Sequence, residues 1–311
     1  MKQYLDINDI ENLPETIKEA IELKKEPFKH KELGKNKTLA MLFFNASLRT
    51  RLSTEKAAKN LGMEVMVLNV DSAWNLEFDE GAIMNLGTAE HIKEAAQVLS
   101  QYADVIAVRA FPGLVDREQD ESEQVLYGFQ KYATVPVINM ESSTGHPLQA
   151  LADAISIEEL SFKKKPKVVL SWAPHPKALP HAVANSFVQM MQKREVDFFI
   201  THPKGYELNP EMVKDVKVYY DQEQALEDAD IVYVKNWSSY KEYGKVLNTD
   251  NNWMLTKEKV GNAKFMHCLP VRRNVVVEDA VLDSENSIVI QQANNRTYAA
   301  QIVLKKMLEE L

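Results

Sequence analysis

The chain has 311 residues, a formal net charge of −8 and one cysteine, Cys268. Its length suggests two domains, and its acidic balance argues against a nucleic-acid binder, which usually carries a basic excess. One cysteine excludes an internal disulfide framework, no apolar run reaches the ~18 residues of a membrane span, and the first residues lack the apolar core of a secretory signal. The sequence therefore predicts a cytoplasmic globular protein with no nucleic-acid or membrane partner.

Short apolar runs alternate with segments of helical period along the chain. Near-continuous apolar runs are typical of strands covered on both faces, and strand–helix alternation predicts parallel sheets. The expected fold class is α/β, with two doubly wound parallel-sheet domains joined by helices. The expected strands are residues 38–44, 64–70, 105–111, 136–140, 167–173, 197–202, 216–221, 230–237, 264–270 and 287–292, and the expected helices include 91–101, 119–131, 147–160, 178–193 and 295–311.

A basic, proline-containing stretch, residues 161–167, is the predicted domain boundary. The stretch 240–262 has few apolar residues and is an expected long loop, and long loops inside compact domains are often functional. The last helix is amphipathic and is expected to pack back on the first domain. The predicted division is 1–146 for the first domain, 147–160 for a linking helix, 161–294 for the second domain and 295–311 for the returning helix.

The first motif, Ser47-Leu48-Arg49-Thr50-Arg51, follows an expected strand where a helix begins. A helix N-terminus presents free N–H groups and the positive end of the helix dipole, so it holds phosphate well. Hydroxyl groups add donors, and an arginine makes bidentate contacts to phosphate oxygens. The same residues also suit an ordinary capping box with two solvated arginines, and their spacing alone leaves both interpretations open.

The second motif, His146-Pro147-Leu148-Gln149, has the same arrangement of strand, Ser/Thr/Gly turn and helix. Proline is well suited to the first helical turn. His146 and Gln149 would both reach a ligand at that helix end. The alternative is a histidine that only caps its helix.

The third motif, His267-Cys268-Leu269-Pro270, closes an apolar strand, and ligands of open α/β sheets bind at such strand ends. A buried, inert cysteine is the alternative. No matching ligand pair at zinc spacing accompanies His267 and Cys268, so no metal is expected. The chain has neither G-x-G-x-x-G nor G-x-x-x-x-G-K-[ST], which argues against a dinucleotide or nucleotide enzyme, and no cofactor is expected.

Taken together and in this order, the three motifs resemble those of the aspartate/ornithine carbamoyltransferase family: S-x-R-T-R, H-P-x-Q and the H-C-L-P of its ornithine branch. The resemblance covers nearly the whole chain. It implies transfer of the carbamoyl group of carbamoyl phosphate to an amine, in a homotrimer whose sites are shared between subunits.

The resemblance also implies roles for individual residues. Thr50, Arg109 and His146 would be preorganised donors aimed at the oxyanion that develops on the carbamoyl oxygen, and together with Cys268 they are the expected catalytic residues. Leu48 would act through its backbone N–H, and Trp74 would reach the site from a neighbouring subunit. The residues implied for carbamoyl phosphate are Ser47, Leu48, Arg49, Thr50, Trp74, Arg109, His146, Gln149, Cys268, Leu269 and Arg296.

One segment departs from the ornithine enzymes, which carry an aspartate in D-x-W-x-S-M-G for the α-ammonium of ornithine. Here Lys235 occurs in the matching segment Val234–Lys241. A lysine would repel an α-ammonium but suits a substrate whose α-nitrogen is acylated. The chain thus resembles the N-acylornithine carbamoyltransferases, which implies a knotted second domain and acylornithine contacts from Glu141, His175, Lys235 and Arg272.

The loop Gly87–His91 bears on the acyl group. In this subfamily the residue two before the histidine is an acid in acetyl enzymes and a proline in succinyl enzymes. Ala89 would not repel the extra carboxylate of a succinyl group, which favours N-succinyl-L-ornithine, whereas a one-residue shift would place Glu90 there and favour the acetyl substrate. The expected function is the formation of N-acyl-L-citrulline in arginine biosynthesis. The alternatives are an ordinary ornithine carbamoyltransferase and a non-catalytic paralogue that binds carbamoyl phosphate.

Overall fold

The computed structural model describes residues 1–70, 74–85, 87–160, 165–248 and 250–311. The chain forms two compact units, and the helices α6 (Pro147–Leu160) and α11 (Val289–Leu308) each run from one unit into the other. Residues 161–164 of the expected boundary lie outside the described residues, and the functional labels of the two expected domains stay predictions. Unit 1 comprises Met1–Gly113, Glu118–Leu148 and Arg296–Leu311, and unit 2 comprises Leu114–Arg117 and Gln149–Asn295.

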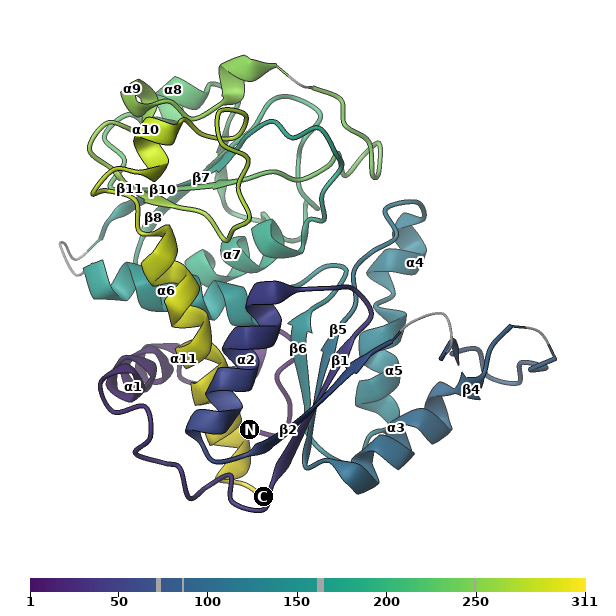
Figure 1. Cartoon of the computed structure of the whole chain (residues 1–311). Coiled ribbons are helices and arrows are strands. Elements are labelled where there is room, and N and C mark those ends of the chain that lie inside the picture. The colour runs from purple at the N-terminus through teal and green to yellow at the C-terminus, as the bar shows by residue number, and fades with distance from the viewer. Residues whose placement is uncertain (71–73, 86, 161–164, 249) are drawn as a thin grey trace. The chain divides into compact units, whose positions relative to one another are not determined.

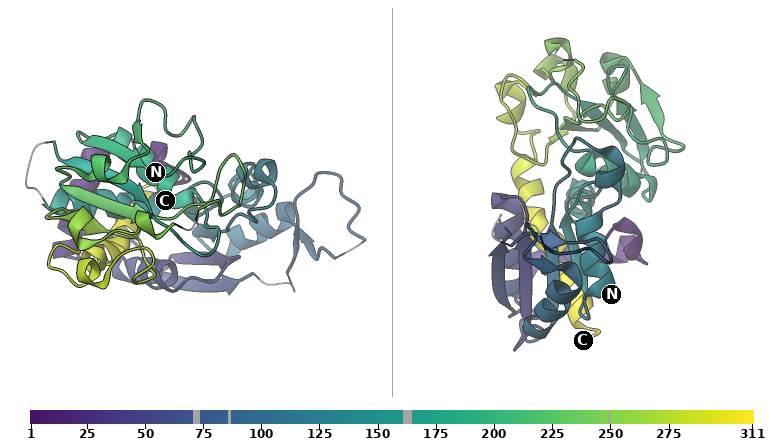
Figure 2. Two further views of the ribbon diagram at one scale, coloured as in Figure 1. Left: turned by 90° about the horizontal axis from the view of Figure 1, so that it is seen from above. Right: turned by 90° about the vertical axis from the view of Figure 1, so that its right-hand side faces the viewer.

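Unit 1 is built on a parallel sheet of order β2-β1-β5-β6 (Figure 1). Ala40 and Leu42 of β1 belong to a buried apolar cluster with α3 and α5, and the alternate residues Leu39 and Met41 are fully buried on the other face. On that face α11 lies alongside α2 (Figures 1 and 2). The elements are η1 (Ile7–Asp9), α1 (Leu13–Lys25), β1 (Thr38–Phe43), α2 (Leu48–Asn60), β2 (Glu64–Asn69), β3 (Leu76–Glu77), β4 (Glu90–His91), α3 (Ile92–Tyr102), β5 (Val105–Arg109), α4 (Arg117–Glu121), α5 (Gln124–Tyr132) and β6 (Val137–Glu141).

Unit 2 is built on a second parallel sheet, of order β11-β10-β7-β8-β9. One face packs Val169, Val232 and Phe265 against the short helices α8 to α10. On the other face Phe187 of α7 meets Tyr233 edge to face, with ring centroids 4.4 Å apart. The elements are β7 (Lys167–Trp172), α7 (Ala182–Gln192), β8 (Asp197–Thr201), β9 (Lys217–Tyr219), α8 (Gln222–Leu226), β10 (Ile231–Lys235), η2 (Asn251–Trp253), α9 (Lys257–Val260), β11 (Lys264–Met266) and α10 (Asp279–Leu282).

The predicted α/β class with two parallel sheets is confirmed, but several boundaries are wrong. The expected strand 287–292 is a single bridge at Ser287 followed by α11, because a short apolar run does not separate a strand from a buried helix. The last helix therefore begins at Val289 rather than at residue 295. The expected helix 119–131 is split between α4 and α5 at Glu123, whose φ is +50°. The stretch 240–262 contains η2 and α9, its residue 249 lies outside the described residues, and the knot stays a prediction.

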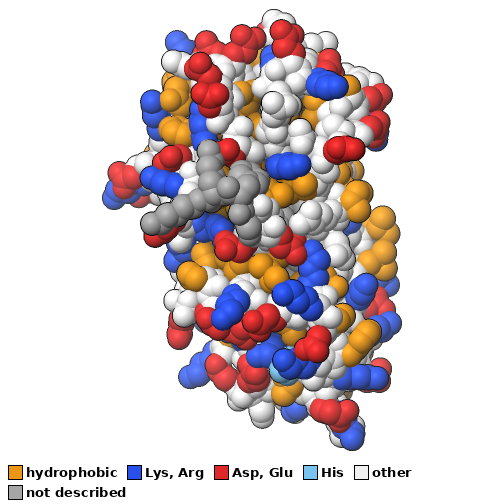
Figure 3. Space-filling view, turned by 90° about the vertical axis from the view of Figure 1, so that its left-hand side faces the viewer, with side chains coloured by type: hydrophobic (Ala, Val, Ile, Leu, Met, Phe, Trp, Pro, Cys, Tyr) orange, Lys and Arg blue, Asp and Glu red, His pale blue; other side chains and the backbone are white. Residues whose placement is uncertain are grey.

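Two further observations bear on the expected partners. No helix within the described ranges is long and apolar enough to cross a bilayer. On the face shown in Figure 3, the visible Lys and Arg side chains are interspersed with Asp and Glu rather than gathered into a basic stripe.

Candidate active site

The first predicted motif forms the N-terminal turn of α2. Ser47 has an extended backbone (φ −153°, ψ 124°), and its side chain accepts a hydrogen bond from the Thr50 backbone N–H at 3.3 Å. Leu48 is 69% exposed, so the turn is open to solvent. The first N–H groups of a helix have no partner within it, and this turn therefore offers donors to an anion.

Thr50, in the same turn, is buried and bound to a residue far along the chain. Its Oγ1 accepts a hydrogen bond of 2.7 Å from Nη2 of Arg296 on α11. Because the arginine occupies one lone pair of the hydroxyl oxygen, the hydroxyl proton is left to donate to an oxygen. The fold thus brings Arg296, near the C-terminus, to the first motif.

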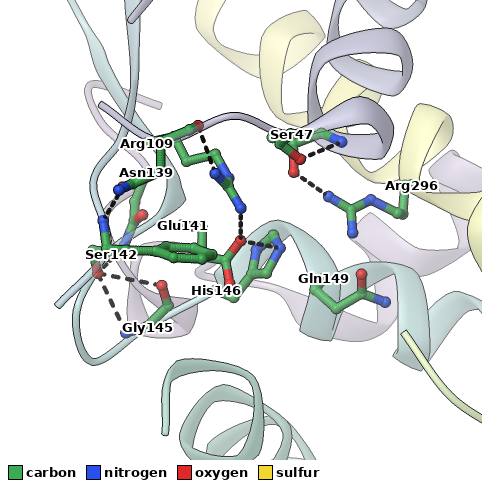
Figure 4. Close-up of polar contacts among 12 residues, drawn as sticks. Ser47, Arg109, Asn139, Glu141, Ser142, Gly145, His146, Gln149 and Arg296 are labelled. Atoms are coloured by element: carbon green, nitrogen blue, oxygen red, sulfur yellow. Dashed lines mark hydrogen bonds and ion pairs between the residues drawn. The ribbon is translucent and has the colours of Figure 1, made fainter. Parts of the chain in front are cut away.

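Arg109, at the end of β5, connects the first two motifs (Figure 4). Its Nη1 donates to the backbone oxygens of Asn45 at 2.7 Å and Ala46 at 3.0 Å, and its Nη2 donates to Oε2 of Glu141 at 3.1 Å. Burial lowers the pKa of Arg109, and the Glu141 carboxylate partly offsets that effect. Arg109 therefore remains a charged donor, held beside the loop that leads into Ser47.

Glu141 and His146 stand at the two ends of the turn between β6 and α6. His146 Nε2 lies 3.4 Å from Glu141 Oε2, and both side chains are buried. A single carboxylate oxygen therefore faces both Arg109 and His146 (Figure 4). Arg109 and His146 were predicted to bind carbamoyl phosphate, and both contact Glu141, which was predicted to bind the amine substrate.

A second network lies in unit 2 and contains the other residues predicted for the carbamoyl group. Gln149 donates from Nε2 to Oδ1 of Asp153 at 2.7 Å, and Gln292 donates to the same oxygen at 2.7 Å. Gln292 Oε1 in turn accepts from the backbone N–H of His267 at 2.9 Å, next to the buried Cys268. One buried carboxylate thereby fixes the amide of Gln149 and the backbone that precedes Cys268 and Leu269.

Three cationic side chains surround His175 in unit 2. Arg272 Nε donates to His175 Nε2 at 3.0 Å, and His175 Nδ1 lies 2.9 Å from the carbonyl oxygen and 3.1 Å from the backbone nitrogen of Lys177. Burial lowers the pKa of His175, a hydrogen bond with the Lys177 backbone partly offsets that effect, and the nearby charges of Arg272, Lys235 and Lys177 lower the pKa further. Neither Lys235 nor Arg272 forms an ion pair with a carboxylate among the residues that the structure describes. The cluster is suited to an anionic ligand.

The remaining predicted residues lie in the loop between β2 and α3. Trp74 Nε1 donates to Oε2 of Glu90 at 2.7 Å, and the Ala89 backbone N–H donates to Asn75 O at 2.8 Å. Within the described part of the chain, no hydrogen bond joins Trp74, Ala89 or Glu90 to Arg109. Figure 1 shows β4 projecting away from the unit 1 sheet.

The sequence analysis assigned no role to Glu123, Asp153 or Gln292. Asp153 follows Gln149 at the i, i+4 spacing of neighbouring side chains on a helix, and that signal could have found it. Glu123 stands in an acidic stretch with no such signal. Among the described residues, no group of three or more His, Cys, Asp or Glu side chains is arranged to hold a metal ion.

Comparisons with known proteins agree with these motifs. The family model for the carbamoyl-P binding domain of aspartate/ornithine carbamoyltransferase matches residues 2–159, and the model for its Asp/Orn binding domain matches residues 180–307. An N-succinylornithine carbamoyltransferase from Bacteroides thetaiotaomicron is 50% identical over 100% of both chains. An N-acetylornithine carbamoyltransferase from Xylella fastidiosa is 37% identical over 91% of this chain and 92% of the relative.

Solved structures of N-acetyl-L-ornithine transcarbamylase are similar over nearly the whole chain. One has a TM-score of 0.91 and 35% identity, covering 99% of this chain and 100% of its own. A variant in which alanine replaces a glutamate, complexed with carbamyl phosphate and N-succinyl-L-norvaline, has a TM-score of 0.92 and 36% identity at the same coverage. The chain belongs to the aspartate/ornithine carbamoyltransferase family.

Proposed function

We propose that this enzyme transfers the carbamoyl group of carbamoyl phosphate to the δ-amine of an Nα-acylated L-ornithine, with N-succinyl-L-ornithine favoured over N-acetyl-L-ornithine. The product would be N-acyl-L-citrulline, an intermediate of arginine biosynthesis. The observation that carries this proposal is the group of Lys235, Arg272 and neutral His175, in which neither cation forms an ion pair with a carboxylate of the described residues. Acylation removes the positive charge from the α-nitrogen and leaves the α-carboxylate for these cations to bind.

Unit 1 would bind the phosphate and polarise the carbamoyl oxygen. The open first turn of α2 and the side chains of Ser47 and Arg49 would take the phosphate oxygens. Thr50, Arg109 and His146 would donate toward the carbamoyl oxygen, where negative charge develops. Arg296 would act beside Thr50, to which it is bonded.

Unit 2 would hold the carbamoyl nitrogen. The backbone carbonyl groups of Cys268 and Leu269 and the side-chain oxygen of Gln149 are acceptors suited to an NH2 group. Asp153 accepts a hydrogen bond from Nε2 of Gln149, which orients the Gln149 amide. Glu141 would position the δ-amine or accept from the acyl amide N–H.

In the chemical step, the lone pair of the δ-amine attacks the carbamoyl carbon. A C–N bond forms, the bond from carbon to the phosphate oxygen breaks, and phosphate leaves with that electron pair while the nitrogen loses a proton. The amine must be neutral to attack, and a free alkylamine has a pKa near ~10.4. A cationic, desolvated site would lower that pKa.

Ala89 is the basis for favouring a succinyl group. An uncharged side chain there would accept the distal carboxylate, which a glutamate would repel. The only carboxylate next to it in sequence, Glu90, already accepts from Trp74. The solved relative in which alanine replaces a glutamate and which carries N-succinyl-L-norvaline supports the same inference. We further propose a cytoplasmic homotrimer in which Trp74 and Ala89 serve a neighbouring subunit.

The test is to measure phosphate release and formation of a citrulline-type product from carbamoyl phosphate with ornithine, N-acetyl-L-ornithine and N-succinyl-L-ornithine side by side. Turnover with the succinylated amine alone would support the whole proposal, and turnover with the acetylated amine alone would overturn the role of Ala89. Activity with free ornithine would overturn the role of Lys235, and inactivity with all three would indicate a non-catalytic paralogue.

A further inference from the structure

We propose that Glu123 is a positioning residue that sets the location of His146 and Glu141 by holding the turn between them. This inference rests on the proposed carbamoyl transfer, in which His146 polarises the carbamoyl oxygen. Glu123 stands just before α5, and it is only 7% exposed although its side chain is a carboxylate. A buried carboxylate is unfavourable unless its oxygens are well satisfied.

Four donors from a single turn satisfy this carboxylate. Oε1 accepts from Ser142 Oγ at 2.7 Å and from Thr144 at both its backbone N–H (2.7 Å) and its Oγ1 (2.6 Å). Oε2 accepts from the Ser143 backbone N–H at 3.1 Å. No lysine or arginine forms an ion pair with Glu123 in the ranges that the structure describes, so these dipoles alone balance its charge.

The backbone conformation of Glu123 is also unusual. Its φ of +50° lies in the left-handed region, which non-glycine residues seldom adopt. It occupies the N-cap position of α5, yet its side chain makes no capping hydrogen bond to that helix. Strained backbone of this kind persists where the surrounding structure imposes it and is concentrated at functional sites. The turn at residues 142–145 is the contact that accounts for both the strain and the burial.

The turn itself links the two side chains of the site. It is closed by the Ser142 backbone N–H, which donates to Gly145 O at 2.8 Å, and Asn139 Nδ2 donates to Ser142 Oγ at 3.0 Å (Figure 4). Glu141 directly precedes the turn and His146 directly follows it. Fixing the turn therefore fixes the 3.4 Å separation of His146 Nε2 from Glu141 Oε2.

Glu123→Gln tests this role, because its amide nitrogen is a donor and cannot accept from the N–H groups that face it. A misplacement of about 1 Å at a reacting group can cost ~100-fold in rate, so we expect kcat to fall roughly tenfold to 100-fold. The KM for carbamoyl phosphate should change little, since the first turn of α2, with Ser47 and Arg49, would hold the phosphate end. Glu118→Gln, an exposed carboxylate on α4, is the matched control and should match the wild type.

Amide hydrogen exchange of residues 142–146 gives a measurement that does not depend on turnover. Exchange of the Ser143 and Thr144 amides should be faster in Glu123→Gln and unchanged in Glu118→Gln. Glu123→Asp keeps the charge on a shorter arm and should give smaller changes in the same sense, and it decides the matter if the glutamine variant does not fold.

Wild-type kcat in Glu123→Gln, or a fall in kcat without faster exchange in the turn, would overturn the positioning role. Failure of the proposed function looks different. In that case the wild type itself would carbamoylate none of the three amines, while the exchange rates of the variants would still report whether Glu123 holds the turn.

Discussion

The two units differ in how their charged side chains are satisfied. In unit 1, Arg109 is paired with Glu141, Arg296 donates to Thr50, and the Glu123 carboxylate accepts four hydrogen bonds. In unit 2, Lys235 and Arg272 surround a neutral histidine and have no carboxylate partner within the described residues. Arg109 and Arg296, predicted for carbamoyl phosphate, are thus fixed by the protein, whereas Lys235 and Arg272, predicted for the amine substrate, leave their charge to be neutralised by a ligand.

This difference matches two separate requirements of the proposed reaction. Donors aimed at a developing oxyanion act best when they are preorganised, because no reorganisation then accompanies the chemical step. Discrimination between related amines is achieved by an unpaired charge, which attracts one substrate and repels another. Substitutions in unit 1 should therefore affect both stability and rate, and substitutions around His175 should mainly affect the choice of amine.

The largest expected effect follows Arg109→Met. Removing one partner of a buried ion pair leaves an uncompensated charge on Glu141, which costs about 3–5 kcal/mol of stability. Loss of a donor to the developing oxyanion typically lowers kcat ~100- to 1,000-fold. Urea unfolding and steady-state kinetics would measure the two effects, and a variant that keeps wild-type kcat would remove Arg109 from the chemistry.

A double variant separates the two effects of that change. Arg109→Met combined with Glu141→Gln no longer buries an unpaired carboxylate, so the urea midpoint should recover most of its loss. The activity should stay low because the donor is still missing. Recovery of activity together with stability would mean that Arg109 serves folding alone.

A smaller effect, confined to substrate choice, is expected for Lys235→Asp. An acid in this place would repel the α-carboxylate of an acylated ornithine, and breaking such a charge contact lowers kcat/KM by ~100-fold or more. Stability should not fall, because Lys235 contributes one of the like charges around His175. Lys235→Met, which removes the charge without reversing it, should give an intermediate loss, and unchanged kinetics in the aspartate variant would exclude Lys235 from the site.

Sequence patterns placed two of the candidate residues at strand ends and helix starts, where the structure has them. Ser47 follows β1 and His146 precedes α6, whereas Arg109, which ends β5, was singled out by the family resemblance. The same patterns failed where the choice between a strand and a helix depended on tertiary contacts. Residues 287–292 have the apolar composition of a strand. In the structure, residues 289–292 instead form the start of α11, the helix that runs from unit 2 into unit 1.

Residues that act through others were not predictable in this way. Glu123 lies in an acidic stretch whose composition is typical of exposed residues. Only the fold shows that its carboxylate is buried and accepts hydrogen bonds from the turn that precedes His146. Gln292 is likewise separated in sequence from Asp153 and His267, which it joins through space. Such contacts depend on the tertiary arrangement of helices and strands, which residue types and local spacing do not reveal.

Ala89→Glu tests whether residue 89 determines the choice of acyl group, and its expected effect is moderate. A carboxylate near the distal carboxylate of a succinyl group adds like-charge repulsion, and we expect roughly tenfold lower kcat/KM for N-succinyl-L-ornithine, since about 1.4 kcal/mol corresponds to tenfold. The value for N-acetyl-L-ornithine should stay near that of the wild type. Ala89→Gln, of similar size and without charge, is the control, and equal losses in both variants would indicate a steric effect only.

The smallest expected effect concerns the pH dependence of stability. Its measurement tests whether the cations around His175 keep the imidazole neutral. Its folded-state pKa is lowered from 6.5 by burial and by the charges of Arg272, Lys235 and Lys177. Between that lowered pKa and the unfolded value the unfolded chain binds more protons, so stability rises with pH across this window and is lost as pH falls through it. The urea midpoint of the wild type should therefore fall slightly more between pH 7.5 and 5.5 than that of His175→Asn, which does not titrate. Saturating N-succinyl-L-ornithine should reduce the difference because its carboxylates neutralise the cations, and an identical loss in both proteins would show that His175 is not held neutral by its neighbours.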